Sequence, residues 1–129
     1  MKFKLLSVLL FPLLVMAQNQ PTERTLHENW EFSSNSNTLK GSATVPGNIH
    51  TDLWNAEIIE DPYKGTNELN YQWIQDSTWI YTTTFQVSEQ ELASHLVFLE
   101  FEGLDTYATI YLNEMEIGKS DNMFLAWQN

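Results

Sequence analysis

The sequence predicts an all-β fold, either a β-sandwich or a jelly roll. Short segments rich in β-branched and aromatic residues recur along the second half of the chain, and tight turns separate them. Only two short segments have the pattern of a helix, and short strands with little helix are typical of sandwiches and jelly rolls. With 129 residues, 43% of them hydrophobic, the chain is long enough for one domain with a core and too short for two.

The first 17 residues have the pattern of a signal peptide. A short basic segment, MKFK, precedes the apolar run LLSVLLFPLLVMA, which is too short to span a bilayer and contains a proline. The small or modest residues that end this run predict cleavage between Ala17 and Gln18. The sequence contains no cysteine for lipid attachment, so we expect a periplasmic or secreted protein. Residues 18–27 are then a flexible lead-in to a domain at residues 28–129.

Two short strands are expected at the start of this domain, at residues 30–32 and 43–45, on either side of a polar loop. Pro46 and Gly47 predict a turn after the second strand, because proline fixes φ and glycine accepts positive φ. Asn48 is the predicted cap of a short helix over residues 49–54. The apolar side chains of this helix share one face at the helical spacing, and they are Ile49, Leu53 and Trp54.

The second half of the domain is predicted to contain four more strands, at residues 79–85, 95–102, 108–112 and 115–118. A capping-box pattern at residues 88–91 opens one or two helical turns, and Asn113-Glu114 is the expected turn between the last two strands. Alternation predicts which side chains share a face: Trp79, Tyr81, Thr83 and Phe85 in the first strand, Val97, Leu99 and Phe101 in the second, and Ala108, Ile110 and Leu112 in the third.

Residues 57–78 show little periodicity and form the longest irregular stretch of the domain. Long ordered loops inside compact domains are usually functional or docked against something. Its aromatic residues Tyr71 and Trp73, with Trp79 just beyond, have side chains of the kind that stack on sugar rings. Core packing is the ordinary role of at least two of them.

The charge balance argues against nucleic-acid and membrane-surface binding. The chain has 17 acidic and six basic residues, a formal net charge of −11. Loss of Lys2 and Lys4 with the signal peptide leaves four basic residues and a net charge of −13. Such a surface repels phosphate backbones and anionic lipids, whereas a neutral ligand such as a sugar is compatible with it.

No catalytic set, metal site or cofactor motif is visible in the sequence. Glu100 and Glu102 lie about 6.5 Å apart on one strand face, but two carboxylates on the same strand leave no cleft for a sugar between them. The three histidines have no metal-ligand spacing, and the acidic residues of the loop lack the spacing of an EF-hand. The histidines are His27, His50 and His95, and the acidic loop residues are Glu57, Glu60 and Asp61. No nucleophile-elbow motif is present.

Four linked motifs resemble the N-terminal domain of β-mannosidases of the glycoside hydrolase family 2 group. The resemblance covers the chain from about residue 26 to its end. The motifs are Trp30-Glu31-Phe32, VPGNIHTDLWNAEIIEDPYKGTNE at residues 45–68, WIQDSTWIY at residues 73–81, and FEGLDTYATIYLNEMEIG at residues 101–118 followed by Asn122-Met123-Phe124. The series in this order is far more specific than any one of the motifs.

This resemblance implies a galactose-binding-like jelly roll, incomplete at its C-terminal end, that packs on a missing catalytic barrel. The parent enzyme is expected to be a retaining exo-β-mannosidase that removes terminal non-reducing β-D-mannose from mannosides and manno-oligosaccharides. Its two catalytic glutamates belong to the barrel, so no residue of this chain is catalytic and the fragment on its own is expected to be inactive. The resemblance also places a loop of this domain at the barrel mouth, and Trp73 and Asp76 are the expected substrate-proximal residues.

The same resemblance assigns an architectural role to residues 101–113. They are expected to be two neighbouring strands joined by a tight corner, with the bend at Gly103 and with Leu104 and Ala108 packed inward. One departure is the turn at Asn113-Glu114, where relatives commonly have Asn-Gly. A glutamate at positive φ costs on the order of 1 kcal/mol, which leaves room for a longer turn.

Three alternatives remain open from the sequence. The chain is compatible with a stand-alone carbohydrate-binding module that uses surface aromatic residues. It is also compatible with the same domain of a β-galactosidase or a β-glucuronidase, or with a non-functional remnant. The sequence downstream of Asn129 distinguishes these alternatives, because a barrel with paired glutamates identifies an enzyme.

Overall fold

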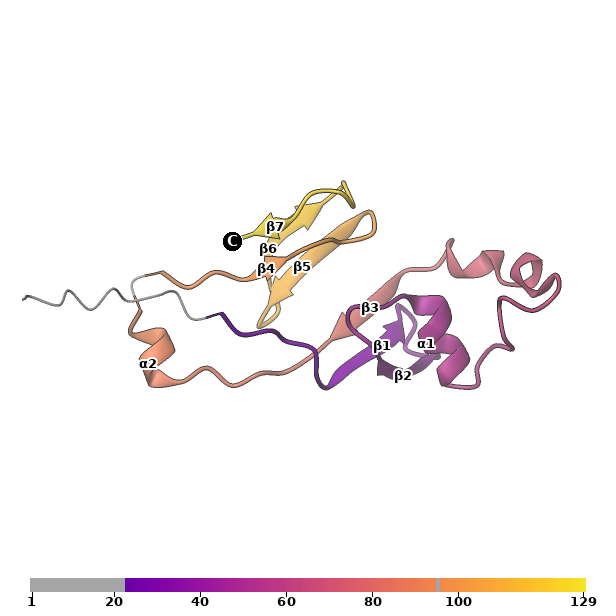
Figure 1. The fold of residues 1–129 in the computed structure, drawn as a ribbon, viewed down its shortest axis with the longest axis horizontal. Coiled ribbons are helices and arrows are strands. Elements are labelled where there is room, and N and C mark those ends of the chain that lie inside the picture. The colour runs from indigo at the N-terminus through magenta and orange to yellow at the C-terminus, as the bar shows by residue number, and fades with distance from the viewer. Residues whose placement is uncertain (1–22, 95) are drawn as a thin grey trace, which may run out of the picture. The chain divides into compact units, whose positions relative to one another are not determined.

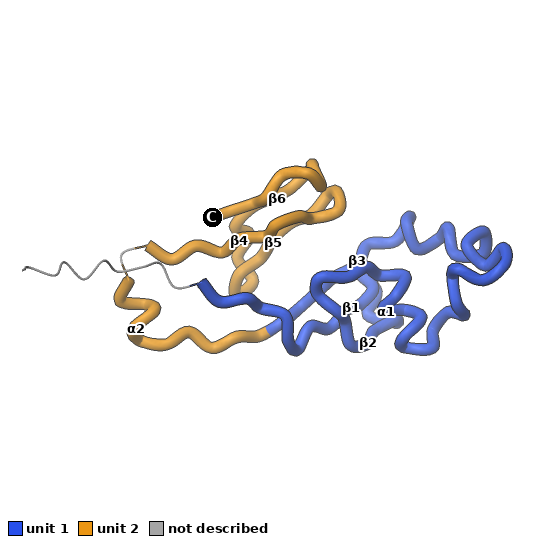
Figure 2. Tube along the Cα trace, viewed as in Figure 1, with its two compact units in different colours: residues 1–83 blue, residues 84–129 orange. Residues whose placement is uncertain are grey.

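The computed structural model describes residues 23–94 and 96–129. The predicted cleavage site between Ala17 and Gln18 lies outside the described residues, and so does His95. Within the described residues the chain forms seven strands and four short helical segments (Figure 1), so the all-β prediction is confirmed. The chain divides into two compact units, Met1–Thr83 and Thr84–Asn129 (Figure 2).

The first unit is built on an antiparallel sheet of three strands with β1 (Trp30–Ser34) in the middle. It is flanked by β2 (Lys40–Ala43) on one side and β3 (Trp79–Thr82) on the other. Phe32 in the central strand lies opposite Gly41 and Tyr81. A Cβ atom on Gly41 would come within 2.9 Å of the Phe32 ring. The ring can pack here because glycine has no side chain.

Helix α1 (Ile49–Asn55) covers this sheet and begins as predicted. The Asn48 side chain accepts a hydrogen bond from the Thr51 N–H at 3.1 Å, the expected N-cap contact. Leu53 is fully buried, but the prediction that Trp54 shares its face is wrong, because Trp54 is 41% exposed. One helical position turns the side chain by about 100°, and in this helix the buried neighbour of Leu53 is Asp52.

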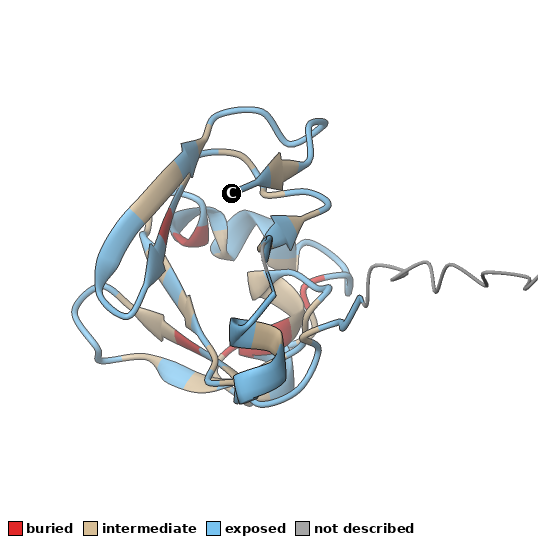
Figure 3. Cartoon of the chain, turned by 90° about the vertical axis from the view of Figure 1, so that its left-hand side faces the viewer, coloured by how far each residue is buried: buried red, intermediate tan, exposed pale blue. Residues whose placement is uncertain are grey.

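The core of the first unit consists of four buried apolar side chains, Phe32, Leu53, Ile59 and Ile74. They come from β1, α1 and the long loop that follows the helix. Most other described residues are exposed or intermediate (Figure 3). Burial of these four side chains is therefore the main hydrophobic contribution to the stability of this unit.

The second unit contains helix α2 (Glu89–Leu92) and two small antiparallel sheets. The capping box is confirmed, since Ser88 and Glu91 each accept a hydrogen bond from the other's N–H, but the helix has a single turn. One sheet pairs β4 (Glu100–Phe101) with β7 (Trp127–Gln128), and the other pairs β5 (Ala108–Leu112) with β6 (Met115–Ser120).

Three strand predictions need correction. The strand expected over residues 79–85 ends at Thr82, because β1 provides partners only for residues 79–82. The strand expected over residues 95–102 is assigned only at residues 100–101, where β7 lies alongside, and the strand expected at 43–45 lies at 40–43. Alternation indicates which residues favour a strand, but the partner decides where the strand ends.

The corner at residues 103–107 is tight, but Gly103 does not have a positive φ. A Cβ atom there would lie 3.3 Å from the Met123 carbonyl oxygen, so close approach of the backbone explains the glycine better than the bend does. Leu104 and Ala108 are half-buried, as predicted. The Thr106 hydroxyl donates a hydrogen bond to the Asp105 carboxylate. Leu112 was expected on the buried face of β5 but is 40% exposed, beyond an irregularity in the strand pairing.

The hairpin between β5 and β6 keeps a two-residue turn. Leu112 pairs with Met115, and both turn residues have positive φ, 50° at Asn113 and 66° at Glu114. Paired positive φ values match the right-handed twist of hairpin strands and favour Asn-Gly. The longer turn that the sequence allowed does not form, and Glu114 takes the conformation that glycine usually adopts.

We therefore predict that Glu114→Gly stabilises the chain by roughly 1 kcal/mol, because glycine adopts positive φ without a Cβ clash. The measurement is urea unfolding followed by circular dichroism. Glu116→Gly, in the adjoining strand, is the matched control, and it should lower the stability because glycine weakens a strand. An unchanged or lower stability of Glu114→Gly would contradict the assignment of strain to this turn.

Candidate functional site

The candidate site is the long loop between α1 and β3, which carries both predicted substrate-proximal residues. Two short 3-10 helices order its second half, η1 (Asn67–Asn70) and η2 (Gln72–Ile74). Trp73 lies in the second of these helices, and Asp76 follows it. Both side chains are exposed, Trp73 to 39%.

Hydrogen bonds hold this loop along its length. The Glu60 N–H donates to the Tyr71 hydroxyl at 2.9 Å, and the Asn67 side-chain amide donates to the Asp61 carbonyl at 2.8 Å. Ile74 is 1% exposed and inserts into the core of the first unit, where its carbonyl accepts a hydrogen bond from the Trp79 indole at 2.9 Å. The loop is thus an ordered part of the first unit.

Aromatic contacts connect Trp73 to the core. The Trp73 and Trp79 ring centroids lie 6.2 Å apart, and the Trp79 and Phe32 centroids lie 6.1 Å apart in an edge-to-face arrangement. Trp79 and Tyr71 are half-buried and pack against the core cluster. Two of the three aromatic residues therefore have the core-packing role that was expected for them. Trp73 contacts Trp79 and is 39% exposed, which suits a contact to an apolar face of a ligand or of another domain.

A buried carboxylate that the sequence does not predict connects α1 to the segment after β2 and to β3. Asp52 is 1% exposed, and both of its carboxylate oxygens accept hydrogen bonds. Oδ1 accepts from the Thr44 N–H at 2.9 Å, and Oδ2 accepts from the Tyr81 hydroxyl at 2.8 Å. The signal for it in the sequence is a single acidic residue directly before the buried Leu53 in a short helix.

This contact changes the chemistry of Tyr81. Burial raises the pKa of the Tyr81 hydroxyl above its ordinary value near 10, and the hydrogen bond and negative charge of Asp52 raise it further. The Tyr81 hydroxyl therefore stays protonated and remains a donor to Asp52 across the neutral pH range. The pair acts as a fixed structural contact and not as an acid–base catalyst at neutral pH.

The acidic residues that were weighed as catalytic or metal-binding candidates do not converge. Glu100 and Glu102 are both exposed, at the short strand β4 and directly after it. Asp61 uses one carboxylate oxygen to accept from the Tyr63 N–H within its own turn. Among the described residues no group of three or more histidines and acidic residues is placed to hold a metal ion.

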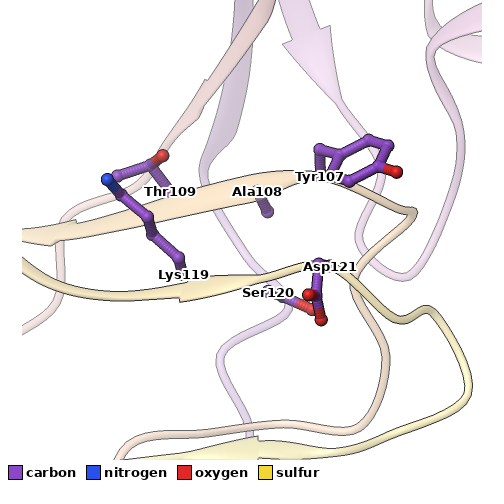
Figure 4. Close-up of a pocket in the computed structure, with 6 residues that line it drawn as sticks. All are labelled: Tyr107, Ala108, Thr109, Lys119, Ser120 and Asp121. Atoms are coloured by element: carbon purple, nitrogen blue, oxygen red, sulfur yellow. The ribbon is translucent and has the colours of Figure 1, made fainter.

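A cavity of about 370 Å³ lies on the β5–β6 hairpin of the second unit (Figure 4). Its walls are Tyr107, Ala108, Thr109, Lys119, Ser120 and Asp121. It is open to solvent, and the Lys119 ammonium forms an exposed 3.4 Å ion pair with Glu116. The cavity contains a single carboxylate and no buried polar group, so it lacks the paired acids that glycoside cleavage requires.

Together these features define a β-domain with an ordered, partly aromatic loop. Among the described residues its only buried carboxylate is Asp52, which is fully used in structural hydrogen bonds. The helices in this part of the chain are also too short to cross a membrane.

The chain belongs to the glycosyl hydrolase 2 galactose-binding domain-like family, whose profile matches residues 30–129. It is 43% identical over 100 residues to a protein named β-mannosidase from Bos taurus, covering 78% of this chain and 11% of that protein. It is 41% identical over 99 residues to a probable β-mannosidase from Caenorhabditis elegans, covering 77% of this chain and 11% of that protein. The crystal structure of a β-D-mannosidase from Dictyoglomus thermophilum matches with a TM-score of 0.73 and 45% identity, over 77% of this chain and 12% of that one.

The chain thus spans about one-ninth of the length of the relatives that it matches. The matched range, residues 30–129, includes sequence from both compact units. The family assignment and the galactose-binding-like fold predicted from the motifs are confirmed.

The contact between Asp52 and Tyr81 gives a prediction for stability and its pH dependence. Tyr81→Phe should lower the free energy of unfolding at neutral pH by about 1–3 kcal/mol, because it leaves a buried carboxylate oxygen without its donor. A raised pKa in the folded state means that the folded chain holds more protons than the unfolded chain above about pH 10. The contribution of Tyr81 is therefore fully present below that pH and is lost as the pH rises toward the folded-state pKa.

Urea unfolding at several pH values up to about pH 11 measures both effects. The wild-type chain should lose stability with rising pH more steeply than Tyr81→Phe above about pH 10. Tyr107→Phe removes a hydroxyl from a side chain that is 87% exposed, and it serves as the matched control. A Tyr81→Phe chain with wild-type stability and an unchanged alkaline slope would refute the structural role of this contact.

Proposed function

We propose that this chain is the non-catalytic N-terminal domain of a β-mannosidase that removes terminal non-reducing β-D-mannose residues. The observation that carries the proposal is the match to β-mannosidases at 41–45% identity through most of the chain. The absence of a convergent pair of acids among the described residues supports the non-catalytic role. Retaining cleavage requires two carboxyl groups about 5 Å apart across a sugar pocket.

In this proposal the catalytic glutamates belong to another domain of the enzyme, and the present domain packs against that domain within one polypeptide. β-Mannosides and manno-oligosaccharides are the substrates of the whole enzyme. The stand-alone binding module is less well supported, since the single partly exposed tryptophan of the loop also packs against Trp79. A β-galactosidase or β-glucuronidase is less well supported than a β-mannosidase because of the names of the relatives.

The substrate assignment is tested with a full-length enzyme that carries this domain, using chromogenic glycosides. Nitrophenol release from a β-mannoside should greatly exceed release from the corresponding β-galactoside and β-glucuronide. Preference for either of the other two glycosides would replace the β-mannosidase assignment with a related specificity.

The loop at residues 67–76 is proposed to face the active site of the full-length enzyme. Its order in the first unit, the 39% exposure of Trp73 and the exposed carboxylate of Asp76 support this placement. Hydroxyl-rich sugars are commonly oriented by carboxylates and held against aromatic rings. The competing role of this surface is packing against a neighbouring domain without contact to the sugar.

We predict that Asp76→Ala in the full-length enzyme lowers kcat/KM for a chromogenic β-mannoside by roughly tenfold or more, as expected for loss of a charged hydrogen bond. The melting temperature should stay unchanged, because Asp76 is exposed and outside the core. Gln75→Ala, at the neighbouring exposed position, is the matched control and should retain activity. Wild-type kinetics in Asp76→Ala would rule out its proximity to the substrate.

The proposed enzyme is periplasmic or secreted, on the basis of the basic and apolar pattern of residues 1–17. We predict that the mature protein begins at Gln18. Amino-terminal sequencing and intact mass of material exported by a bacterial host provide the measurement. Replacement of Ala17 by a bulky residue, Ala17→Trp, should block processing, since signal peptidases require a small residue there. Exported protein that retains residues 1–17 would contradict the prediction.

A further inference from the structure

The two residues that the proposed function places near the substrate lie in one tight turn, residues 73–77. The turn begins in η2 and ends just before β3. Ile74 is buried in the core of the first unit and Ser77 is half-buried, whereas Trp73 and Asp76 are exposed. One side of the turn is therefore anchored in the first unit, and the other side carries the two proposed substrate-proximal side chains.

Ser77 supplies the donors that close this turn. A helix leaves its last carbonyl groups without intrahelical donors, so those of η2 need other partners. The Gln72 carbonyl accepts a hydrogen bond from the Gln75 N–H at 3.2 Å. The next two carbonyls both accept from Ser77: its hydroxyl donates to the Trp73 carbonyl at 2.8 Å, and its N–H donates to the Ile74 carbonyl at 3.3 Å.

The two hydrogen bonds of Ser77 differ in how much else supports them. The Ile74 carbonyl also accepts from the Trp79 indole at 2.9 Å, and the Ile74 side chain is buried in the core. For the Trp73 carbonyl, the Ser77 hydroxyl is the one donor found among the described residues. Loss of the hydroxyl therefore loosens the turn but leaves the anchor at Ile74 in place.

We propose that Ser77 is a positioning residue whose hydroxyl fixes the turn that places the Asp76 carboxylate, an inference that rests on the proposed function of the loop at residues 67–76. Asp76 lies between the anchor at Ile74 and the donor groups of Ser77, so the two ends of the turn set the place of its α-carbon. Because the Asp76 side chain is exposed, the backbone of the turn decides where the carboxylate lies.

The hydroxyl is expected to matter more for catalysis than for stability. One neutral hydrogen bond contributes only modestly to the stability of a protein, so the first unit should stay folded without it. Catalysis is more sensitive, since a displacement of about 1 Å in a group that positions the substrate can cost about a hundredfold in rate. Threonine retains the hydroxyl that donates to the carbonyl four residues earlier, and alanine lacks it.

The kinetic test uses the full-length enzyme and a chromogenic β-mannoside. Ser77→Ala should lower kcat/KM by about three- to tenfold, the factor that corresponds to one neutral hydrogen bond. Ser77→Thr should recover most of the wild-type value, because it restores the donor. The melting temperatures of both variants should stay close to that of the wild type.

Ser94→Ala is the matched control for the loss of such a hydrogen bond. The Ser94 hydroxyl also donates to the carbonyl four residues earlier, that of Gln90, at 3.4 Å, and it lies just after α2 in the second unit. This variant should keep the wild-type kcat/KM. Equal losses in Ser77→Ala and Ser94→Ala, or a Ser77→Thr enzyme as impaired as Ser77→Ala, would overturn the specific role of the Ser77 hydroxyl.

A double-mutant comparison tests whether Ser77 acts through Asp76. In the Asp76→Ala background, Ser77→Ala should cause little further loss of kcat/KM, because the carboxylate that it positions is already absent. Losses that multiply in full would show that the two residues act independently, and they would overturn the proposed positioning of Asp76.

Hydrogen exchange of the full-length enzyme, measured by mass spectrometry, separates the role of Ser77 from the placement of the loop. Ser77→Ala should speed exchange in peptides that cover residues 73–78, and Ser77→Thr should not. Unchanged exchange in Ser77→Ala would overturn the positioning role. Faster exchange together with wild-type kinetics of Asp76→Ala would instead overturn the proposed placement of the loop at the active site, and with it the catalytic consequence of the turn.

Discussion

The buried carboxylate of Asp52 is the interaction on which the first unit depends. It accepts hydrogen bonds from the backbone of Thr44 and from the side chain of Tyr81, and it lies beside Leu53 in the core. These contacts tie α1 to the segment after β2 and to β3, two elements that are far apart in sequence. A buried carboxylate without its partners is costly, so the helix, the turn and the strand are stable only together.

The second unit depends on a different and smaller contact. The Trp127 ring lies against Gly118, where an added Cβ atom would come within 2.7 Å of the indole nitrogen, and it packs edge-to-face with Phe101. This contact connects β7 with both β4 and β6. Ile110 is the only buried apolar residue described in this unit, whereas four are buried in the first. Two-stranded sheets with so little burial are marginal by themselves, which is consistent with the exposed apolar side chains found there.

The parts of this structure that the sequence predicted are those governed by local rules. The Asn48 cap, the Ser88 capping box and the alternation around Tyr81 depend on residues a few positions apart, and each is present. The ends of the strands depend on distant partners, which is why the sequence does not predict β7 and predicts a longer strand in place of β4. The pairing of Asp52 with Tyr81 spans 29 residues, and the periodicity of the sequence does not predict such a long-range contact. The hairpin turn shows the opposite case, since strand pairing at Leu112 and Met115 imposed positive φ on a glutamate.

The loop at residues 67–76 is ordered by contacts within the first unit. All of the hydrogen bonds described for it, and the insertion of Ile74 into the core, lie within the first unit. The backbone around Trp73 and Asp76 is therefore held by contacts of Ile74 and Trp79 within the first unit. Groups that are ordered in advance lose little conformational entropy when a partner binds. In the function proposed above, this loop holds its side chains at the boundary with the catalytic domain, and the reacting carboxyl groups belong to that domain.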